Sequence, residues 1–311
     1  MTPPSAAALA ERPAAAVHSA PGPLRPAAST YPASPAAGLH AGVPVLPGAS
    51  WKRFLVHEPL GRGATATVFR GTDLSDGRPV AIKLAGGPEP LQADRIRAEA
   101  RVLASLDHPS IVAFIAGGVV TAGEQWAGRP FIVEELAYGG SLAERIRSGP
   151  ADAGEVAGWA AAALSGLAHV HSRGLAHRDI KPANILLSGL RRSAIRIADF
   201  GISTPVGAEL EPGDSSGTVT YMSPEQAAGQ HPGAPGDVYS LGLVLLECLT
   251  GAKAFPGSLM ESLVARTIRS PWIPADLGTA WVSLLTAMTA MDPARRPKAA
   301  SAQKLAAKLA R

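Results

Sequence analysis

The spacing of apolar residues changes along this chain near Gly139 and Gly140. Before these glycines, short runs of β-branched and aromatic residues alternate with Gly and Asp, which is typical of a strand meander. The runs are residues 54–56, 67–71, 79–84, 114–120 and 129–136. Residues 91–106 lie among them and predict a helix, because Ile96, Ala100, Leu103 and Leu106 recur on one helical face.

After the two glycines, apolar residues recur with helical spacing. The pattern predicts helices over residues 141–147, 154–172, 237–250, 260–269, 279–291 and 301–310, with short strands at 185–187 and 195–198. A chain of 311 residues is long for one compact core. The predicted fold class is therefore α+β, in which a strand-rich N-lobe (51–137) precedes a mainly helical C-lobe (138–311).

The first 50 residues differ in composition from the rest. Half of them are Pro or Ala, and their only charged residues are Glu11, Arg12 and Arg25. Proline blocks helices, and apolar periodicity is absent here, so residues 1–50 are predicted to form a disordered Pro/Ala-rich tail. A transit peptide is an alternative because acids are scarce, although arginine is also sparse.

Composition narrows the classes of partner and location. The net charge is +4 and the pI is near 9.4, but no long Lys/Arg run is present, so specific nucleic-acid binding is not expected. No apolar run of about 18 residues and no secretory signal are evident, so no membrane association is expected. The single cysteine, Cys248, lies in an apolar run and predicts a buried thiol, which fits a cytoplasmic protein.

A polar segment at residues 177–184, His-Arg-Asp-Ile-Lys-Pro-Ala-Asn, is followed by Asp-Phe-Gly at 199–201. Its candidate functional side chains are Asp179, Lys181, Asn184 and Asp199. Carboxylate and amide oxygens suit Mg²⁺, and phosphoryl transfer needs a positioned nucleophile together with dispersal of negative charge. The two segments therefore predict a phosphoryl-transfer site rather than a chance polar loop.

A glycine-rich segment joins two predicted strands early in the N-lobe. Glycines let the backbone approach phosphate groups and offer N–H donors to them. The usual third glycine of such a segment is Ala66 here, and its methyl group is expected to stiffen the loop tip. The candidate nucleotide-binding residues are Leu60, Gly61, Arg62, Gly63, Ala64, Thr65, Ala66, Thr67 and Val68.

Lys83 ends the run Val-Ala-Ile-Lys on the next predicted strand, and Glu99 lies on the predicted helix. A lysine among apolar neighbours is usually a strand-end side chain that reaches water, and Glu99 alone would fit a solvated helix face. An ion pair between them would instead hold the ammonium on the α- and β-phosphates of a nucleotide.

The order of these segments, followed by Ser-Pro-Glu at 223–225, resembles the eukaryotic-like (Hanks-type) protein kinase family. The resemblance covers roughly residues 51–311 and looks closest to bacterial serine/threonine kinases, on the runs at 217–226 and 237–242. It implies a bilobal kinase fold, ATP and Mg²⁺ (with Mn²⁺ as an alternative ion) as cofactors, and a signalling role. The implied reaction is transfer of the ATP γ-phosphoryl group to Ser/Thr hydroxyls of protein substrates, including the chain itself.

The resemblance also implies a role for each matching catalytic residue. Asp179 is the expected catalytic base, and Asn184 and Asp199 are the expected Mg²⁺ ligands. Lys181 would contact the γ-phosphate and favours Ser/Thr over Tyr acceptors, since tyrosine kinases of this family usually lack it. Lys83 and Glu99 would form the ion pair described above.

Other matching residues are expected to support the fold. His177 would pack against Phe200, with a proton-transfer role as the alternative. Glu225 and Arg296 would form a buried ion pair. Asp237 would hold the backbone of the His-Arg-Asp segment, and the alternative is an N-cap for its own helix.

The adenine site is expected at residues 131–138, where backbone groups of Glu135 and Ala137 would bond the base. The side chains expected to enclose the ring are Val68, Ala81 and Leu186. In this register Glu134 lies behind the adenine, where the family usually has an apolar or hydroxyl side chain. A buried carboxylate is unfavourable unless paired, so either Glu134 accepts a bond from the adenine amino group or the register slips by one residue.

Arg178 precedes Asp179, and in this family such an arginine commonly pairs with a phosphate on the activation segment, here residues 199–225. The candidate acceptors are Ser215, Ser216 and Thr218, and Thr218 would also bond Asp179 and Lys181. An acidic side chain such as Asp214 is an alternative source of the charge.

Two other functions are weaker alternatives. A catalytically weak pseudokinase or scaffold would be favoured by loss of Lys83, Asp179, Asn184 or Asp199, and all four are present. A small-molecule phosphotransferase of related fold would lack the activation segment. Related bacterial kinases often pair through the strand-rich lobe, so a homodimer through the N-lobe is expected by analogy.

Overall fold

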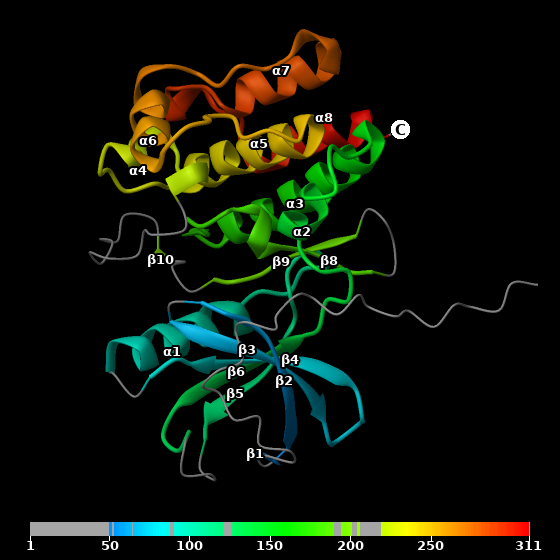
Figure 1. Ribbon diagram of the computed structural model, residues 1–311, viewed down its shortest axis with the longest axis vertical. Coiled ribbons are helices and arrows are strands. Elements are labelled where there is room, and N and C mark those ends of the chain that lie inside the picture. Colours follow the sequence, from blue (N-terminus) through cyan, green and yellow to red (C-terminus); the bar gives the residue numbers. More distant parts are fainter. Residues whose placement is uncertain are drawn as a thin grey trace, which may run out of the picture. The chain divides into compact units, whose positions relative to one another are not determined.

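A computed structural model describes residues 50–310, except 52, 64, 88–89, 121–125, 190–193, 201–203 and 206–218 (Figure 1). The predicted tail up to residue 49 lies outside the described residues. So do Ala64 and the candidate phosphorylation sites Ser215, Ser216 and Thr218.

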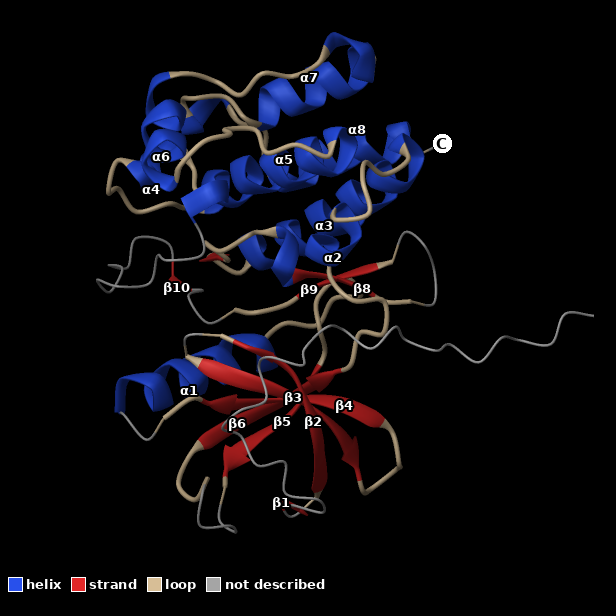
Figure 2. Cartoon of the chain, in the orientation of Figure 1, coloured by secondary structure: helices blue, strands red, loops and turns tan. Residues whose placement is uncertain are grey.

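The N-lobe contains an antiparallel sheet whose strands are ordered β1-β2-β3-β4-β6-β5. Its strands are β1 (Ser50–Trp51), β2 (Phe54–Arg62), β3 (Ala66–Asp73), β4 (Pro79–Ala85), β5 (Phe114–Val119) and β6 (Pro130–Glu135). Helix α1 (Pro90–Ala104) packs against β4, β5 and β6 (Figure 2). The strand meander with one inserted helix is therefore confirmed.

Side chains alternate between the two faces of the sheet. Val80 and Ile82 of β4 are fully buried on one face, whereas Lys83 lies on the other face, towards α1. The cross-strand register places Val68 opposite Lys83 and Glu134 opposite Ala81. One face of the sheet therefore gathers the predicted nucleotide-contacting side chains.

The C-lobe is mainly helical, as predicted. Its helices are α2 (Leu142–Ile146), α3 (Ala153–Ser172), α4 (Pro224–Ala227), α5 (Ala234–Thr250), α6 (Leu259–Ile268), α7 (Thr279–Met288) and α8 (Ala299–Leu309). Short 3₁₀ helices are η1 (Pro182–Asn184), η2 (Val219–Tyr221), η3 (Ala275–Leu277) and η4 (Pro293–Arg295). Two small antiparallel pairs complete it: β7 (Leu175–Ala176) with β10 (Thr204–Pro205), and β8 (Ile185–Leu187) with β9 (Ile195–Ile197).

Helices α3 and α5 form the centre of the C-lobe core. Trp159 and Leu164 of α3 and Val244 and Leu245 of α5 are buried, and α3 also packs against α8. Cys248 of α5 is buried as well, and burial raises the pKa of its thiol to about 12. The prediction of an inert core thiol is consistent with this environment.

Four predicted helix ends were wrong by two or three residues, and one of them is the start of α8, which lies at Ala299 and not at residue 301. Helix α1 ends at Ala104, because Ser105 and Leu106 donate to carbonyls three residues back and tighten the last turn. Helix α5 begins at Ala234, before Asp237, because Gly233 is the N-cap and a proline suits the first turn. Helix α7 ends at Met288, since the chain then turns towards η4, which Pro293 begins.

None of the described helices is both long enough and apolar enough to cross a lipid bilayer.

Candidate active site

The backbone of the His-Arg-Asp segment is held by Asp237. Its carboxylate accepts the N–H of His177 at 2.8 Å and the N–H of Arg178 at 2.7 Å, and His171 Nε2 lies 2.8 Å from the same carboxylate. Burial opposes the charge of Asp237, but the bond to His171 and the backbone donors outweigh it and lower the pKa of this carboxyl. Asp237 lies in the first turn of α5 and Gly233 is the cap, so the N-cap alternative is excluded.

His177 uses both ring nitrogens in bonds to the backbone. Nε2 lies 3.1 Å from the carbonyl oxygen of Ala198, and Nδ1 accepts the N–H of Asp179 at 3.3 Å. The ring is fully buried and packs on Phe200, with centroids 4.7 Å apart. These contacts favour the structural interpretation of His177 over proton transfer.

Asp179 lies at the centre of a small network of donors. Lys181 Nζ donates to Asp179 Oδ2 at 2.7 Å, and Asn184 Nδ2 donates to the same oxygen at 3.1 Å. Asn184 Nδ2 also bonds the backbone carbonyl of Asp179 at 2.9 Å. The carboxylate is thereby oriented by neighbours from its own segment, within hydrogen-bond reach of a cation. A base for an acceptor hydroxyl needs such an orientation.

The Lys83–Glu99 ion pair joins β4 to α1. Lys83 Nζ lies 2.6 and 2.7 Å from the two carboxylate oxygens of Glu99, and it also donates to Asp199 Oδ1 at 2.6 Å. Burial disfavours the ammonium, but Asp199 and Glu99 outweigh it and raise the pKa of Lys83 above its usual value. The contact with Asp199 was not predicted.

Asn184 and Asp199 offer oxygen atoms in adjacent positions. The N–H of Ala198 donates to the carbonyl of Asn184 at 2.9 Å, which brings Asp199 beside η1. The amide nitrogen of Asn184 is engaged by Asp179, so its Oδ1 is the side-chain atom left to act as a ligand. Asp199 has a φ of 67°, an uncommon conformation for a non-glycine residue that functional sites often retain.

This donor set fits Mg²⁺ bound jointly with a nucleotide. Among the described residues there is no cluster of three or more His, Cys, Asp or Glu side chains that could hold a metal. Mg²⁺ is usually bound by one or two protein oxygens together with substrate phosphates rather than by an all-protein cage. One carboxylate and one amide oxygen match that requirement.

Strands β2 and β3 extend further into the glycine-rich segment than predicted. Leu60, Gly61 and Arg62 belong to β2, and residues 66–68 begin β3. Gly63 donates its N–H to the carbonyl of Ala66 at 2.8 Å, which closes the turn. Ala66 is buried within β3, so the expectation that its methyl lies at the loop tip was wrong.

The predicted adenine-binding residues come from both lobes. Glu135 donates its N–H to the carbonyl of Ala113 at 2.9 Å. The carbonyl of Glu135 is therefore the backbone group of this residue left to bond adenine. Val68, Ala81 and Leu186 are partly buried. The side chain of Glu135 bonds Arg196 Nε of β9 at 3.0 Å, a contact between the lobes that sequence reasoning missed.

A family model described as "Protein kinase domain" matches residues 54–306. The chain belongs to the protein kinase family. The predicted bilobal kinase fold is thereby confirmed, and the observed sheet and helices agree with it.

The kinase is similar to several bacterial enzymes. It is 36% identical over 257 residues to serine/threonine-protein kinase PknL of Mycobacterium tuberculosis, covering 78% of this chain and 62% of the relative. It is 32% identical over 264 residues to serine/threonine-protein kinase pkn2 of Myxococcus xanthus, covering 80% of this chain and 31% of the relative. A third match is PknB of Mycobacterium leprae, 36% identical over 236 residues, with 71% and 36% coverage. The kinase thus spans less than two thirds of each of these relatives.

Other contacts of the kinase brace the end of the activation segment. Arg296 forms two bonds with the Glu225 carboxylate, at 2.7 and 2.8 Å, as predicted. Arg266 of α6 is fully buried and donates to the carbonyls of Thr220 and Met222, at 2.9 and 2.6 Å. Sequence reasoning missed Arg266, because an arginine on an amphipathic helix usually lies in solvent.

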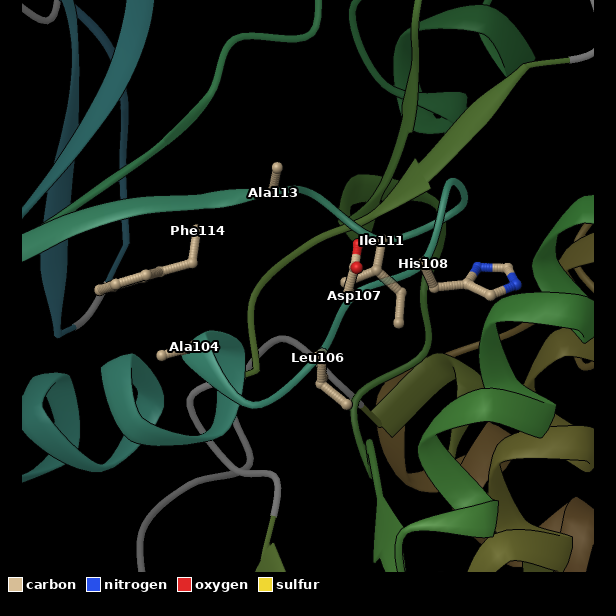
Figure 3. Close-up of a pocket in the computed structure, with 7 residues that line it drawn as sticks. All are labelled: Ala104, Leu106, Asp107, His108, Ile111, Ala113 and Phe114. Carbon is tan, nitrogen blue, oxygen red and sulfur yellow. The ribbon is translucent and has the colours of Figure 1, made fainter.

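A cavity of about 250 Å³ lies between the end of α1 and the start of β5 (Figure 3). Its lining residues are Ala104, Leu106, Asp107, His108, Ile111, Ala113 and Phe114. The His108 side chain points away from the cavity in Figure 3, and its Nε2 lies 3.1 Å from Ser165 Oγ. The lining includes no predicted site residue, so this cavity is distinct from the candidate active site.

Glu134 is a buried acid near the end of β6. It is 9% exposed, and its Oε1 has no hydrogen-bond partner among the described residues. Burial and the nearby Glu99 raise the pKa of this carboxyl to about 8, although Lys83 acts in the opposite direction. At neutral pH Glu134 is therefore mainly a neutral carboxylic acid.

Replacing Glu134 with glutamine should stabilise the kinase increasingly between pH 5 and pH 8. In the unfolded chain the carboxyl ionises near its ordinary pKa of 4.5, whereas in the folded protein it must stay protonated up to about 8. The wild type therefore loses stability as pH rises through this window, and glutamine does not. The difference in unfolding free energy should be on the order of 3 kcal/mol at pH 7 and close to zero at pH 4.5.

Chemical denaturation at several pH values measures this difference. The matched control is Glu58→Gln, because Glu58 is an exposed acid of the same sheet that pairs with Arg70. Its unfolding free energy should follow the wild type within about 0.5 kcal/mol. Equal pH dependence in Glu134→Gln and wild type would contradict the prediction.

Proposed function

We propose that this kinase transfers the γ-phosphoryl group of ATP to serine or threonine hydroxyls of proteins, its own chain included. The observation that carries the proposal is the joint placement of the Lys83–Glu99 pair, Asp199, Asn184 and Asp179 by direct contacts. Family membership and the names of the bacterial relatives support the same reaction.

Each residue has a chemical task in this reaction. The acceptor hydroxyl attacks the γ-phosphorus, its proton passes to the Asp179 carboxylate, and the bond to the β-phosphate oxygen breaks to release ADP. Lys181 lies beside Asp179 and stabilises the negative charge of the transferred group. Lys83, held by Glu99, positions the α- and β-phosphates.

The metal ion and the adenine ring of ATP also have proposed partners. Asn184 and Asp199 would hold Mg²⁺, or Mn²⁺ in its place, and the ion supplies charge neutralisation between the phosphates. The carbonyl of Glu135 and the backbone of Ala137 would bond adenine, between Val68, Ala81 and Leu186. The glycine-rich residues 60–68 would cover the phosphates.

The proposed domain comprises residues 51–311, with the lobes meeting near residues 137 and 138. A cytoplasmic location, protein substrates and a homodimer through the N-lobe remain proposals from composition and analogy. The pseudokinase alternative has no support, since Lys83, Asp179, Asn184 and Asp199, whose loss would favour it, are all present and each bonds a neighbouring site residue.

The direct test incubates the full chain with γ-labelled ATP, Mg²⁺ and a generic protein acceptor. Phosphoamino-acid analysis should find phosphoserine or phosphothreonine on the acceptor or on the kinase. Labelled phosphotyrosine alone, or no label, would overturn the proposal. Asp179→Asn provides the inactive control.

Regulation by the activation segment can be tested in the same sample. We propose that Ser215 or Ser216 accepts the phosphate that Arg178 binds, with the Asp214 carboxylate as the competing source of charge. Mass spectrometry of fully active kinase should find one of the two serines modified. Full activity with both serines unmodified would favour Asp214.

A further inference from the structure

Three acids act on the buried ammonium group of Lys83. Lys83 of β4 has a Coulomb interaction with Glu99 of α1, Asp199 after β9 and Glu134 of β6. An ammonium group has three N–H donors, and three short contacts to Glu99 and Asp199 occupy them. No N–H of Lys83 is therefore left to donate to Glu134. This agrees with the buried Oε1 of Glu134, which has no hydrogen-bond partner among the described residues.

The register of the sheet places Glu134 within reach of Lys83. Glu134 pairs with Ala81 and Ile132 pairs with Lys83, so Glu134 and Lys83 are diagonal neighbours on one face. Diagonal neighbours of an antiparallel sheet are close enough for long side chains to meet. The neighbour of Glu134 on β5 is Phe114, which is uncharged, so Lys83, Glu99 and Asp199 are the charged groups that act on it.

We propose that Glu134 is a positioning residue that determines whether a nucleotide phosphate or the Glu134 carboxylate takes the N–H of Lys83 that Asp199 Oδ1 accepts in this structure. As a neutral acid, Glu134 leaves this donor to the phosphates. As a carboxylate, it competes for the same donor and repels the bound nucleotide. The proposal rests on the proposed function, because it assumes that Lys83 binds the nucleotide.

The proposal predicts that the affinity for nucleotide falls as the pH rises above neutral, and that the ionisation of the Glu134 side chain causes this fall. The raised pKa of Glu134 puts its ionisation near pH 8. One additional buried charge close to the phosphates is expected to weaken binding by about tenfold or more between pH 7 and pH 9.5. Phosphate ionisation of the nucleotide itself is the same for every variant and cancels in the comparison.

The experiment measures the Kd of a non-hydrolysable ATP analogue with Mg²⁺ from pH 6.5 to pH 9.5. Wild type should lose about tenfold or more in affinity across this range, whereas Glu134→Gln should be nearly flat. Glu58→Gln should follow the wild type, since Glu58 is exposed. Superimposable profiles of wild type and Glu134→Gln would overturn the proposal.

A second measurement uses the wild type alone and does not depend on a variant folding. Because the nucleotide favours neutral Glu134, binding near pH 8 must take up protons. Calorimetry in two buffers of different ionisation enthalpy measures this uptake, and its absence would also overturn the proposal. Binding without phosphoryl transfer would overturn the proposed function alone, and absence of binding at every pH would overturn both.

Discussion

Replacing Asp179 with asparagine should lower the rate of phosphoryl transfer by about 10²–10⁴-fold, the contribution typical of a positioned general base. Asparagine keeps the shape of the side chain and an oxygen that accepts from Lys181 or Asn184, but it cannot take up the acceptor proton. The Kd of ATP should change little, because the contacts of Lys83 and Asp199 are unaffected.

Steady-state rates and nucleotide affinity, measured on the same preparations, separate these effects. Asp94→Asn is the matched control, since Asp94 lies exposed on α1 and pairs with nearby Arg97. It should retain the wild-type rate. A rate of Asp179→Asn within about tenfold of wild type would exclude Asp179 as the base.

Replacing Arg296 with methionine should lower the unfolding free energy by about 3–5 kcal/mol, because it leaves a buried carboxylate without its partner. The Arg296 side chain is completely buried and forms two bonds with Glu225, which is itself 9% exposed. It also donates to the carbonyls of Pro235 and Ala290 and lies over the ring of Tyr239.

Chemical denaturation of single and double variants isolates the ion pair. Adding Glu225→Gln to Arg296→Met should restore part of the lost stability, since the unpaired charge is removed. Arg97→Met removes an exposed pair and should change stability by no more than about 0.5 kcal/mol. Equal losses for Arg97→Met and Arg296→Met would show that burial does not govern the effect.

The gross fold and several contacts could be predicted because their signals are local or come from a motif. Apolar periodicity located the sheet strands and the long helices α3 and α5, and the errors lay at helix ends, at the ends of β2 and β3, and in small elements such as α4 and β1. The Lys83–Glu99 pair and the Asp237 bonds were predicted from motif residues, and both are present. The catalytic roles of these residues stay predictions until activity is measured.

Contacts between distant segments whose residues lie outside the motifs were not predictable in the same way. Arg196 bonds Glu135 across the lobes, and Arg266 bonds carbonyls at the end of the activation segment. Neither arginine belongs to a recognisable motif, and each would fit a solvated surface. Their contacts depend on which elements meet in space, and a single sequence does not show this.

The sequence by itself determined the family, the order of the two lobes and the residues proposed for phosphoryl transfer, because fixed motifs and periodic apolar runs carry that information. Only the tertiary structure decided the protonation state of Glu134 and the arrangement of charge around Lys83. Both depend on desolvation and on the summed fields of Glu99, Asp199 and Lys83, which come from three separate segments of the chain.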